Sequence, residues 1–308
     1  MKLQINHTKY YETRYYMLAD ETVITGNRAI TRSFAKINLT LDVLGRRENG
    51  YHDVEMIMQT ISLFDLIIID KAPSGIQLST NLKYLPSNEK NIAYKAAQRF
   101  FAYTGIKGGV RIMIHKNIPV SAGLAGGSGN CAAVLCAMNK LFNANLATDE
   151  LCKIGAEMGA DVPYCILGGT RLAQGIGEIL TPLPQMKKTT VLLVKPPINV
   201  STAAIYEQID SVPLKKHPDN GAMISALKNG DINLVAANLC NVMENVTENM
   251  HPVIRGIKQK MISNGAAGAV MSGSGPTVFG IFDDDTKAKQ SHDSFAHQYK
   301  DVFLVKTV

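Results

Sequence analysis

The chain has 308 residues, of which 46% are hydrophobic and 19% charged, a composition typical of a globular protein. Its length suits two domains of roughly 150 residues each. Its 32 lysines and arginines outnumber its 26 aspartates and glutamates and are spread along the chain, which favours a small anionic substrate and argues against nucleic-acid binding. No apolar run approaches the roughly 20 residues of a membrane-spanning helix, and residues 1–30 contain no apolar signal segment. We therefore expect a cytoplasmic protein without a membrane partner.

The cysteines are odd in number, show no CxxC spacing and mostly lie in apolar periodic stretches: Cys131, Cys136, Cys152, Cys165 and Cys240. This pattern predicts reduced core residues rather than metal ligands or nucleophiles.

Residues 1–30 contain four tyrosines and little apolar periodicity, which predicts an N-terminal arm without an assigned role. After Phe34 the sequence alternates strictly between apolar and polar residues up to Val43, the pattern of a half-buried strand. Lys36 and Asn38 fall on its polar face, which we expect to be exposed. Asn49 and Gly50 then predict a hairpin turn into the apolar segment 54–63, with Tyr51 and His52 just past the turn.

Further along, strands are expected at residues 66–70 and 110–115, with a helix between them that Asn91 caps and Gly105 ends. A second helix is expected to begin near Gly129. Thr148 is expected to cap a third helix that Gly159 closes, which places Asp161 directly after its end.

A cluster of prolines near residues 196–213 indicates a domain boundary, so we expect domains at 31–190 and 191–308. The second domain is predicted to contain strands at 267–271, 277–282 and 302–307, with a helix at 285–298 between the last two. A glycine-rich loop separates the first two of these strands.

The most informative segment is PVSAGLAGGSGNCAA, residues 119–133, which places four glycines between a predicted strand and an amphipathic helix. Such a loop lets several backbone N–H groups converge on one anion, and the helix directs its positive end at the same point. A flexible connection is the alternative interpretation. The chain contains no GxxxxGK[ST] motif, so the segment is not a P-loop.

This loop resembles the second signature motif of the galactokinase, homoserine kinase, mevalonate kinase and phosphomevalonate kinase (GHMP) superfamily. Three further segments resemble 4-diphosphocytidyl-2-C-methyl-D-erythritol kinases in the expected order: SFAKINLTLDVLGRRENGYHDVE, GADVPYCILGGTRLAQGIGEILTPL and MSGSGPTVFGIF. The similarity covers residues 31–308. It implies an α+β, two-domain fold, with an N-terminal ribosomal-S5-like domain and a C-terminal ferredoxin-like α/β sandwich.

The resemblance implies that Asp161 is the catalytic base and that Lys36 assists it. A carboxylate can accept the hydroxyl proton during phosphoryl transfer, and a cation can offset charge on the phosphoryl oxygens. From the residues alone, Asp161 can equally be a helix N-cap, and Lys36 a solvated strand lysine.

The resemblance also implies ATP as co-substrate, with Mg²⁺ expected and Ser128 as a possible contact through magnesium-ATP. The implied nucleotide-binding residues are Asn91, Ile92, Pro119, Val120, Ser121, Ala122, Gly123, Leu124, Ala125, Gly126, Gly127, Ser128 and Gly129. The implied substrate-binding residues are Asn38, Tyr51, His52, Gly273, Ser274 and Gly275, with the tyrosine and histidine at the cytosine. Without the resemblance, Asn91 and Ile92 are a helix cap and a core residue, and the 273–275 segment is a tight turn.

One departure from the family pattern lies at Gly129, where a serine or threonine is usual. If the backbone there is helical, we expect Gly129→Ser to tighten magnesium-ATP binding, because it restores a hydroxyl near the phosphates. A second departure is Phe34, where proline is usual.

The reaction implied is ATP-dependent phosphorylation of the 2-hydroxyl of 4-diphosphocytidyl-2-C-methyl-D-erythritol in non-mevalonate isoprenoid synthesis, by a monomer or weak homodimer. One alternative is a GHMP kinase for another small alcohol. Another is a kinase-like metabolite sensor without turnover, which Gly129 motivates and the presence of both Lys36 and Asp161 opposes.

Overall fold

The structure is a computed structural model that describes residues 22–214 and 216–308. The first 21 residues of the expected arm lie outside the described part. Residues 22–30 do not form an arm, because β1 (Val23–Thr25) pairs antiparallel with the beginning of β2 (Arg28–Arg46). Ala29 is fully buried in the core, so the fold includes this segment although its sequence shows little apolar periodicity.

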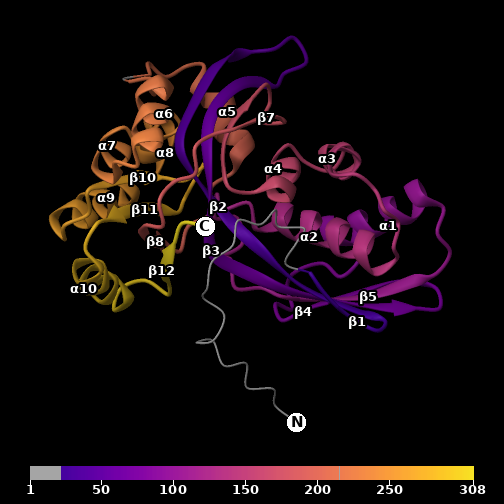
Figure 1. Ribbon diagram of the computed structural model, residues 1–308. Helices are drawn as coiled ribbons and strands as arrows, with labels where there is room; N and C mark the ends of the chain where they lie inside the picture. Colours follow the sequence, from indigo (N-terminus) through magenta and orange to yellow (C-terminus); the bar gives the residue numbers. More distant parts are fainter. Residues whose placement is uncertain (1–21, 215) are drawn as a thin grey trace.

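The first sheet has eight strands among the described residues, with β1, β2, β3, β5 and β4 as neighbours in that order. The other three strands of this sheet branch from these: β6 pairs with β3, β7 pairs with β6, and β9 pairs with β2. The remaining bounds are β3 (His52–Ala72), β4 (Gly75–Thr80), β5 (Gly109–His115), β6 (Thr170–Gln174), β7 (Ile179–Pro182) and β9 (Cys240–Asn241). Four helices gather on one side of this sheet (Figure 1): α1 (Ile92–Thr104), α2 (Gly126–Leu141), α3 (Thr148–Ala156) and α4 (Asp161–Leu167).

The second sheet is antiparallel, with four described strands in the order β10, β11, β8 and β12. Their bounds are β8 (Thr190–Lys195), β10 (Gly268–Met271), β11 (Val278–Phe282) and β12 (Asp301–Lys306). The helices of this half are α5 (Thr202–Ile209), α6 (Asn220–Asn229), α7 (Ile232–Ala237), α8 (Glu244–Met250), α9 (Val253–Ser263) and α10 (Asp285–Ala296). The expected α+β class, with a strand, loop, strand, helix and strand at the C-terminal end, is confirmed.

The long hairpin of β2 and β3 runs through the middle of the molecule, with α1–α4 on one side and α6–α10 on the other (Figure 1). Ile37 and Leu39 of β2 pack in the same core as Val191 of the second sheet. Lys36 and Asn38 point away from that core and are buried as well. The expectation of a half-exposed strand is therefore wrong: both faces are covered, because β2 lies between the two halves of the molecule.

Local boundaries mostly follow the expected signals. Asn91 caps α1 by accepting from the Ala93 N–H at 3.0 Å, and Gly105 ends the helix at φ 68°. Residues 66–70 are part of the continuous strand β3, and α2 begins at Gly126, three residues before the expected start.

The third helix differs at both ends. Its N-cap is Ala147, whose N–H donates to the Glu150 carboxylate at 2.8 Å, so Thr148 is already helical. It ends at Ala156 rather than at Gly159.

All five cysteines are free thiols, and burial raises the pKa of Cys136 to about 12. Cys131, Cys136 and Cys165 are buried as expected of core residues, whereas Cys152 and Cys240 are only partly buried. Across residues 22–214 and 216–308, none of the helices combines the length and the apolar character needed to cross a membrane.

Candidate active site

A cleft of about 710 Å³ opens where the two halves of the molecule meet. All the motifs singled out in the sequence contribute to its walls, although the first and the last lie at Lys36 and Ser274. The lining residues are Lys36, Leu41, Arg46, Asn49, Gly50, Tyr51, His52, Met56, Gly123, Ala125, Ser128, Ala160, Asp161, Ile176, Thr202, Ala203, Tyr206, Glu207, Met243, Gly273 and Ser274.

Lys36 and Asp161 face each other in this cleft. Lys36 Nζ lies 3.8 Å from Asp161 Oδ2 and donates to Asn38 Oδ1 at 2.7 Å. Asn38 is fully buried behind the lysine and does not line the cleft. It therefore orients the ammonium group, and the structure does not bring it to the position expected for a substrate contact.

Asp161 is the first residue of α4, and the N-cap position belongs to Ala160. The alternative interpretation of Asp161 as an N-cap is therefore wrong. Its side chain is 31% exposed and lines the cleft from the first turn of α4.

The glycine-rich loop leads into the N-terminus of α2. The N-cap of α2 is Ala125, which has a left-handed backbone at φ 54° and makes no side-chain cap. The first hydrogen bond of the helix runs from the Gly129 N–H to the Ala125 carbonyl, at 2.8 Å. The N–H groups of Gly126, Gly127 and Ser128 precede that bond in the first turn, where a helix has no internal acceptors to offer. Such N–H groups and the helix dipole favour an anion, so the start of α2 is a candidate anion site, and Ser128 lines the same cleft as Lys36.

Gly129 does not face this anion site. It is buried, and a Cβ built on it would lie 2.7 Å from Ser33 Oγ and 3.1 Å from the Phe34 carbonyl oxygen. The backbone is helical, as the sequence-based expectation required, but a side chain would point into β2 rather than towards a phosphate. The expectation that Gly129→Ser tightens magnesium-ATP binding is therefore wrong.

The loop between β10 and β11 forms the opposite wall. Gly273 has φ 59°, and a Cβ built on it would lie 3.3 Å from the Gly123 carbonyl and 3.6 Å from Lys36 Nζ. A Cβ on Gly123 would lie 2.2 Å from the Ser272 carbonyl, so the two glycine loops pack backbone against backbone. Ser274 lines the cleft as well, whereas Gly275 does not.

An aromatic wall stands at the end of the cleft near the β2–β3 turn. His52 is buried and its Nε2 lies 3.0 Å from Asp210 Oδ1, while its ring stacks on Tyr206 with centroids 5.0 Å apart. Tyr51 is 60% exposed and also lines the cleft. Burial raises the pKa of Tyr206 to about 12, so its phenol remains neutral.

Several predicted nucleotide residues support the loop without lining the cleft. Ala122 and Leu124 are buried in the second core, and Asn91 caps α1 while also donating to the Pro86 carbonyl at 2.9 Å. Ile92 lies against the loop, 3.7 Å from a Cβ built on Gly127. The other predicted loop members, Pro119, Val120, Ser121, Gly126 and Gly127, are also absent from the lining.

Sequence reasoning missed one whole side of the cleft, which comes from α5. Thr202, Ala203, Tyr206 and Glu207 line it, and Asp210 at the end of the same helix pairs with His52. Ser201 marks the start of this helix by capping it through the Ala204 N–H, but nothing in its local sequence indicates a binding role. Gly175 and Gly177 belong to the turn between β6 and β7, whose Ile176 also lines the cleft.

The donor groups here suit a metal ion carried by the nucleotide. Within the described ranges, no group of three or more histidine, cysteine, aspartate or glutamate side chains is arranged to hold a metal. Magnesium in phosphoryl transfer usually takes one or two protein ligands, with phosphates and water completing its shell. Asp161 and Ser128 border the anion site and are oxygen donors of the required kind.

This fold and cleft define the class of GHMP kinases. The family description "GHMP kinases N terminal domain" matches residues 91–169, and "GHMP kinases C terminal" matches residues 223–301. A solved homoserine kinase from Cytophaga hutchinsonii has the same fold, with a TM-score of 0.70 at 17% identity, covering 96% of this chain and 97% of its own.

Relatives with higher sequence identity identify one family within this class. Curated proteins named 4-diphosphocytidyl-2-C-methyl-D-erythritol kinase from Clostridium novyi and Clostridium beijerinckii are 49% and 50% identical over 277 residues, covering 90% of this chain and 99% of theirs. A solved 4-(cytidine 5'-diphospho)-2C-methyl-D-erythritol kinase matches with a TM-score of 0.78 at 29% identity, covering 90% of this chain and 98% of its own. The chain belongs to this family of small-molecule kinases.

Proposed function

We propose that the protein transfers the γ-phosphoryl group of ATP to the 2-hydroxyl of 4-diphosphocytidyl-2-C-methyl-D-erythritol, a step of non-mevalonate isoprenoid synthesis. The observation that carries the proposal is the cleft itself. It places a paired lysine and aspartate between a helix N-terminus that suits phosphate and an aromatic wall that suits a nucleobase.

In the proposed reaction, the hydroxyl oxygen forms a bond to the γ-phosphorus as the bond from that phosphorus to the bridging oxygen of ADP breaks. The hydroxyl proton passes to Asp161, which lines the cleft and whose side chain is 31% exposed. Lys36 offsets charge on the transferring oxygens, and the amides at the start of α2 bind the remaining phosphates. Magnesium, when bound with ATP, would neutralise part of the phosphate charge, and Ser128 and Asp161 of the cleft lining could supply oxygen ligands.

The proposal assigns the cytosine to the aromatic wall. The exposed ring of Tyr51 offers a stacking surface. His52 is held by Asp210 through Nε2, so only its Nδ1 remains for the base edge.

The proposal includes the division into domains 31–190 and 191–308, which is supported by the position of β8 at Thr190–Lys195 as the first strand of the second sheet. It also includes action in the cytoplasm by a monomer or weak homodimer.

The test is a substrate panel. Purified protein is incubated with ATP, magnesium and one of several alcohols, including homoserine, mevalonate and the cytidylated polyol, and ADP release is followed. Sustained turnover is expected with the cytidylated substrate alone. Turnover of another alcohol would assign a different acceptor, and binding of ATP without any turnover would indicate a metabolite sensor.

A further inference from the structure

Three side chains of the segment 241–247 bind the backbone of the glycine loop between β10 and β11. The first is Asn241, the last residue of β9, whose Nδ2 donates to the Met271 carbonyl at 2.8 Å and to the Gly273 carbonyl at 2.7 Å. Its Oδ1 accepts from the Met243 N–H at 3.0 Å. The buried side-chain amide thus donates to two loop carbonyls and accepts from the backbone of its own segment.

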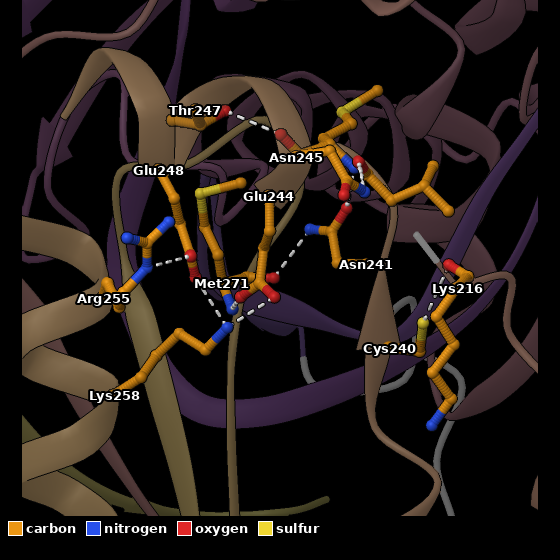
Figure 2. Close-up of polar contacts among 12 residues, drawn as sticks. Lys216, Cys240, Asn241, Glu244, Asn245, Thr247, Glu248, Arg255, Lys258 and Met271 are labelled. Atoms are coloured by element: carbon orange, nitrogen blue, oxygen red, sulfur yellow. Dashed lines mark hydrogen bonds and ion pairs between the residues drawn. The ribbon is translucent and has the colours of Figure 1, made fainter. Parts of the chain in front are cut away.

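Glu244, three residues after Asn241 and at the start of α8, binds the same loop. Its Oε1 accepts from the Met271 N–H at 2.8 Å, so the N–H and the carbonyl of Met271 are bound by the same segment. Figure 2 shows Asn241 and Glu244 converging on Met271, with Lys258 on the other side of the carboxylate. Lys258 donates to Glu244 at 2.6 Å and to Glu248 at 2.7 Å, which compensates the charge of the partly buried Glu244.

Thr247 completes the set one helical turn further on. It is fully buried, and its hydroxyl lies 3.1 Å from the Met243 carbonyl and 3.4 Å from the Ser274 carbonyl. Asn241 and Glu244 therefore bind Met271, Asn241 also binds Gly273, and Thr247 lies against Ser274.

The segment is also tied to the strand that carries the catalytic lysine. β9 pairs in parallel with β2 at Thr40 and Leu41, and the Val242 N–H donates to the Leu41 carbonyl at 3.0 Å. The loop it binds meets Lys36 on its other side, at Gly273. A single set of hydrogen bonds therefore connects β2, the segment and the loop.

We propose that Asn241 and Glu244 are positioning residues for phosphoryl transfer, which hold the Gly273 backbone beside Lys36 and the Gly123 loop. The inference rests on the proposed kinase activity. Neither side chain lines the cleft, so each acts through the loop. Because a displacement of about 1 Å in a reacting geometry can lower turnover by about 100-fold, loss of these bonds is expected to appear in kcat.

The first test compares two isosteric asparagine variants. Asn241→Asp removes the donor to both loop carbonyls. Asn139→Asp is the matched control, because Asn139 also bridges a loop backbone, accepting from the Leu146 N–H at 2.9 Å and donating to its carbonyl at 3.0 Å, but away from the cleft. We expect Asn241→Asp to lower kcat by on the order of 10- to 100-fold, with the Kd for ADP changed less than about 3-fold, and Asn139→Asp to keep the wild-type kcat.

A lower melting temperature with wild-type kcat per folded molecule in Asn241→Asp would overturn the proposal, since a purely structural asparagine would give that result. If Asn241→Asp does not fold, a pair at Glu244 decides instead. Glu244→Gln keeps an acceptor for the Met271 N–H and is expected to retain kcat within about 3-fold, whereas Glu244→Ala is expected to lose at least about 10-fold. Wild-type kcat in Glu244→Ala would overturn the proposal.

Amide hydrogen exchange of residues 271–275 separates this inference from the proposed function, because it needs no substrate. Faster exchange of these amides in Asn241→Asp than in Asn139→Asp is the expected result. Unchanged exchange would overturn the positioning role even if the wild type is an active kinase. Absence of turnover by the wild type on the cytidylated polyol would instead refute the proposed substrate.

Discussion

Lys36 Nζ lies 3.8 Å from Asp161 Oδ2, whereas it lies 2.7 Å from Asn38 Oδ1. The lysine is thus hydrogen-bonded to the asparagine and interacts with the aspartate through charge alone. Only 6% of the lysine side chain is exposed, compared with 31% of the aspartate side chain. The carboxylate therefore keeps an oxygen open to an incoming hydroxyl, beside a cation whose position is set by a third residue.

Asp161→Asn is expected to lower turnover by on the order of 100-fold or more, because the amide cannot accept the hydroxyl proton. Binding of ADP, measured by calorimetry, should change little, and so should the melting temperature, since Ala160 occupies the N-cap of α4. Unfolding of the variant, with full specific activity in its folded fraction, would assign Asp161 to structure.

Lys36→Met is also expected to lower turnover by about 100-fold or more, through loss of charge stabilisation. Because Lys36 is buried, the variant should lose stability as well, by about 1–3 kcal/mol, since Asn38 Oδ1 loses its donor.

A second buried lysine provides the comparison for this variant. Lys116 pairs with the fully buried carboxylate of Asp65 and also donates to Asn130 at 3.1 Å. Lys116→Met leaves that charge unpaired and should cost about 3–5 kcal/mol in urea unfolding. An unchanged steady-state rate in Lys36→Met would remove Lys36 from the mechanism.

Gly129→Ala is expected to destabilise the protein by about 1–3 kcal/mol, because the added methyl group meets Ser33 Oγ and the Phe34 carbonyl. Gly127→Ala is the matched control on the same helix, since its Cβ would meet only Ile92 Cγ2 at 3.7 Å. Thermal unfolding of both variants checks this expectation. Equal melting temperatures would show that β2 and α2 can separate enough to admit a side chain at Gly129.

Tyr51→Ala is expected to raise the KM for the cytidylated substrate by on the order of 10-fold, with the KM for ATP and the melting temperature unchanged, because the ring is exposed and binds a remote part of the substrate. His52→Ala should raise the same KM but should also lower the melting temperature, because His52 is buried against Asp210 and Tyr206. Steady-state kinetics with each substrate varied in turn provide the measurement. An increase of the KM for ATP alone would show that these residues bind ATP rather than the cytidylated substrate.

The raised pKa of Tyr206 leads us to expect that the stability of the folded protein falls at alkaline pH. Burial raises its folded-state pKa to about 12, and an unfolded tyrosine has a pKa of about 10. The folded state therefore binds the phenol proton more tightly, so this stabilisation is complete below pH 10 and is lost as the pH rises from 10 towards 12. The urea midpoint of Tyr206→Phe should fall less between pH 9 and pH 11 than that of the wild type. Tyr84→Phe, at an exposed tyrosine, is the control, and identical slopes for all three proteins would contradict the expectation.

The sequence by itself determined the features that depend on neighbouring residues. Asn91 and Gly105 delimit α1 because a cap and a left-handed residue act within one helical turn. The glycine spacing after Pro119 indicated an anion site because only the local backbone and the next helix are needed to build it. The order of four motifs was enough to indicate the family, and the relatives confirmed it.

Only the tertiary structure decided what depends on contacts between distant segments. Lys36 is buried because α4, which carries Asp161, and the loop at Gly273 lie against the face of the strand that the local alternation marked as exposed. Gly129 must remain a glycine because Ser33 lies against it, and His52 is held by Asp210, 158 residues further along the chain. Asn241 joins a two-residue strand to a loop thirty residues later. Local periodicity carries no information about such pairings, since each joins segments that meet only in the folded chain.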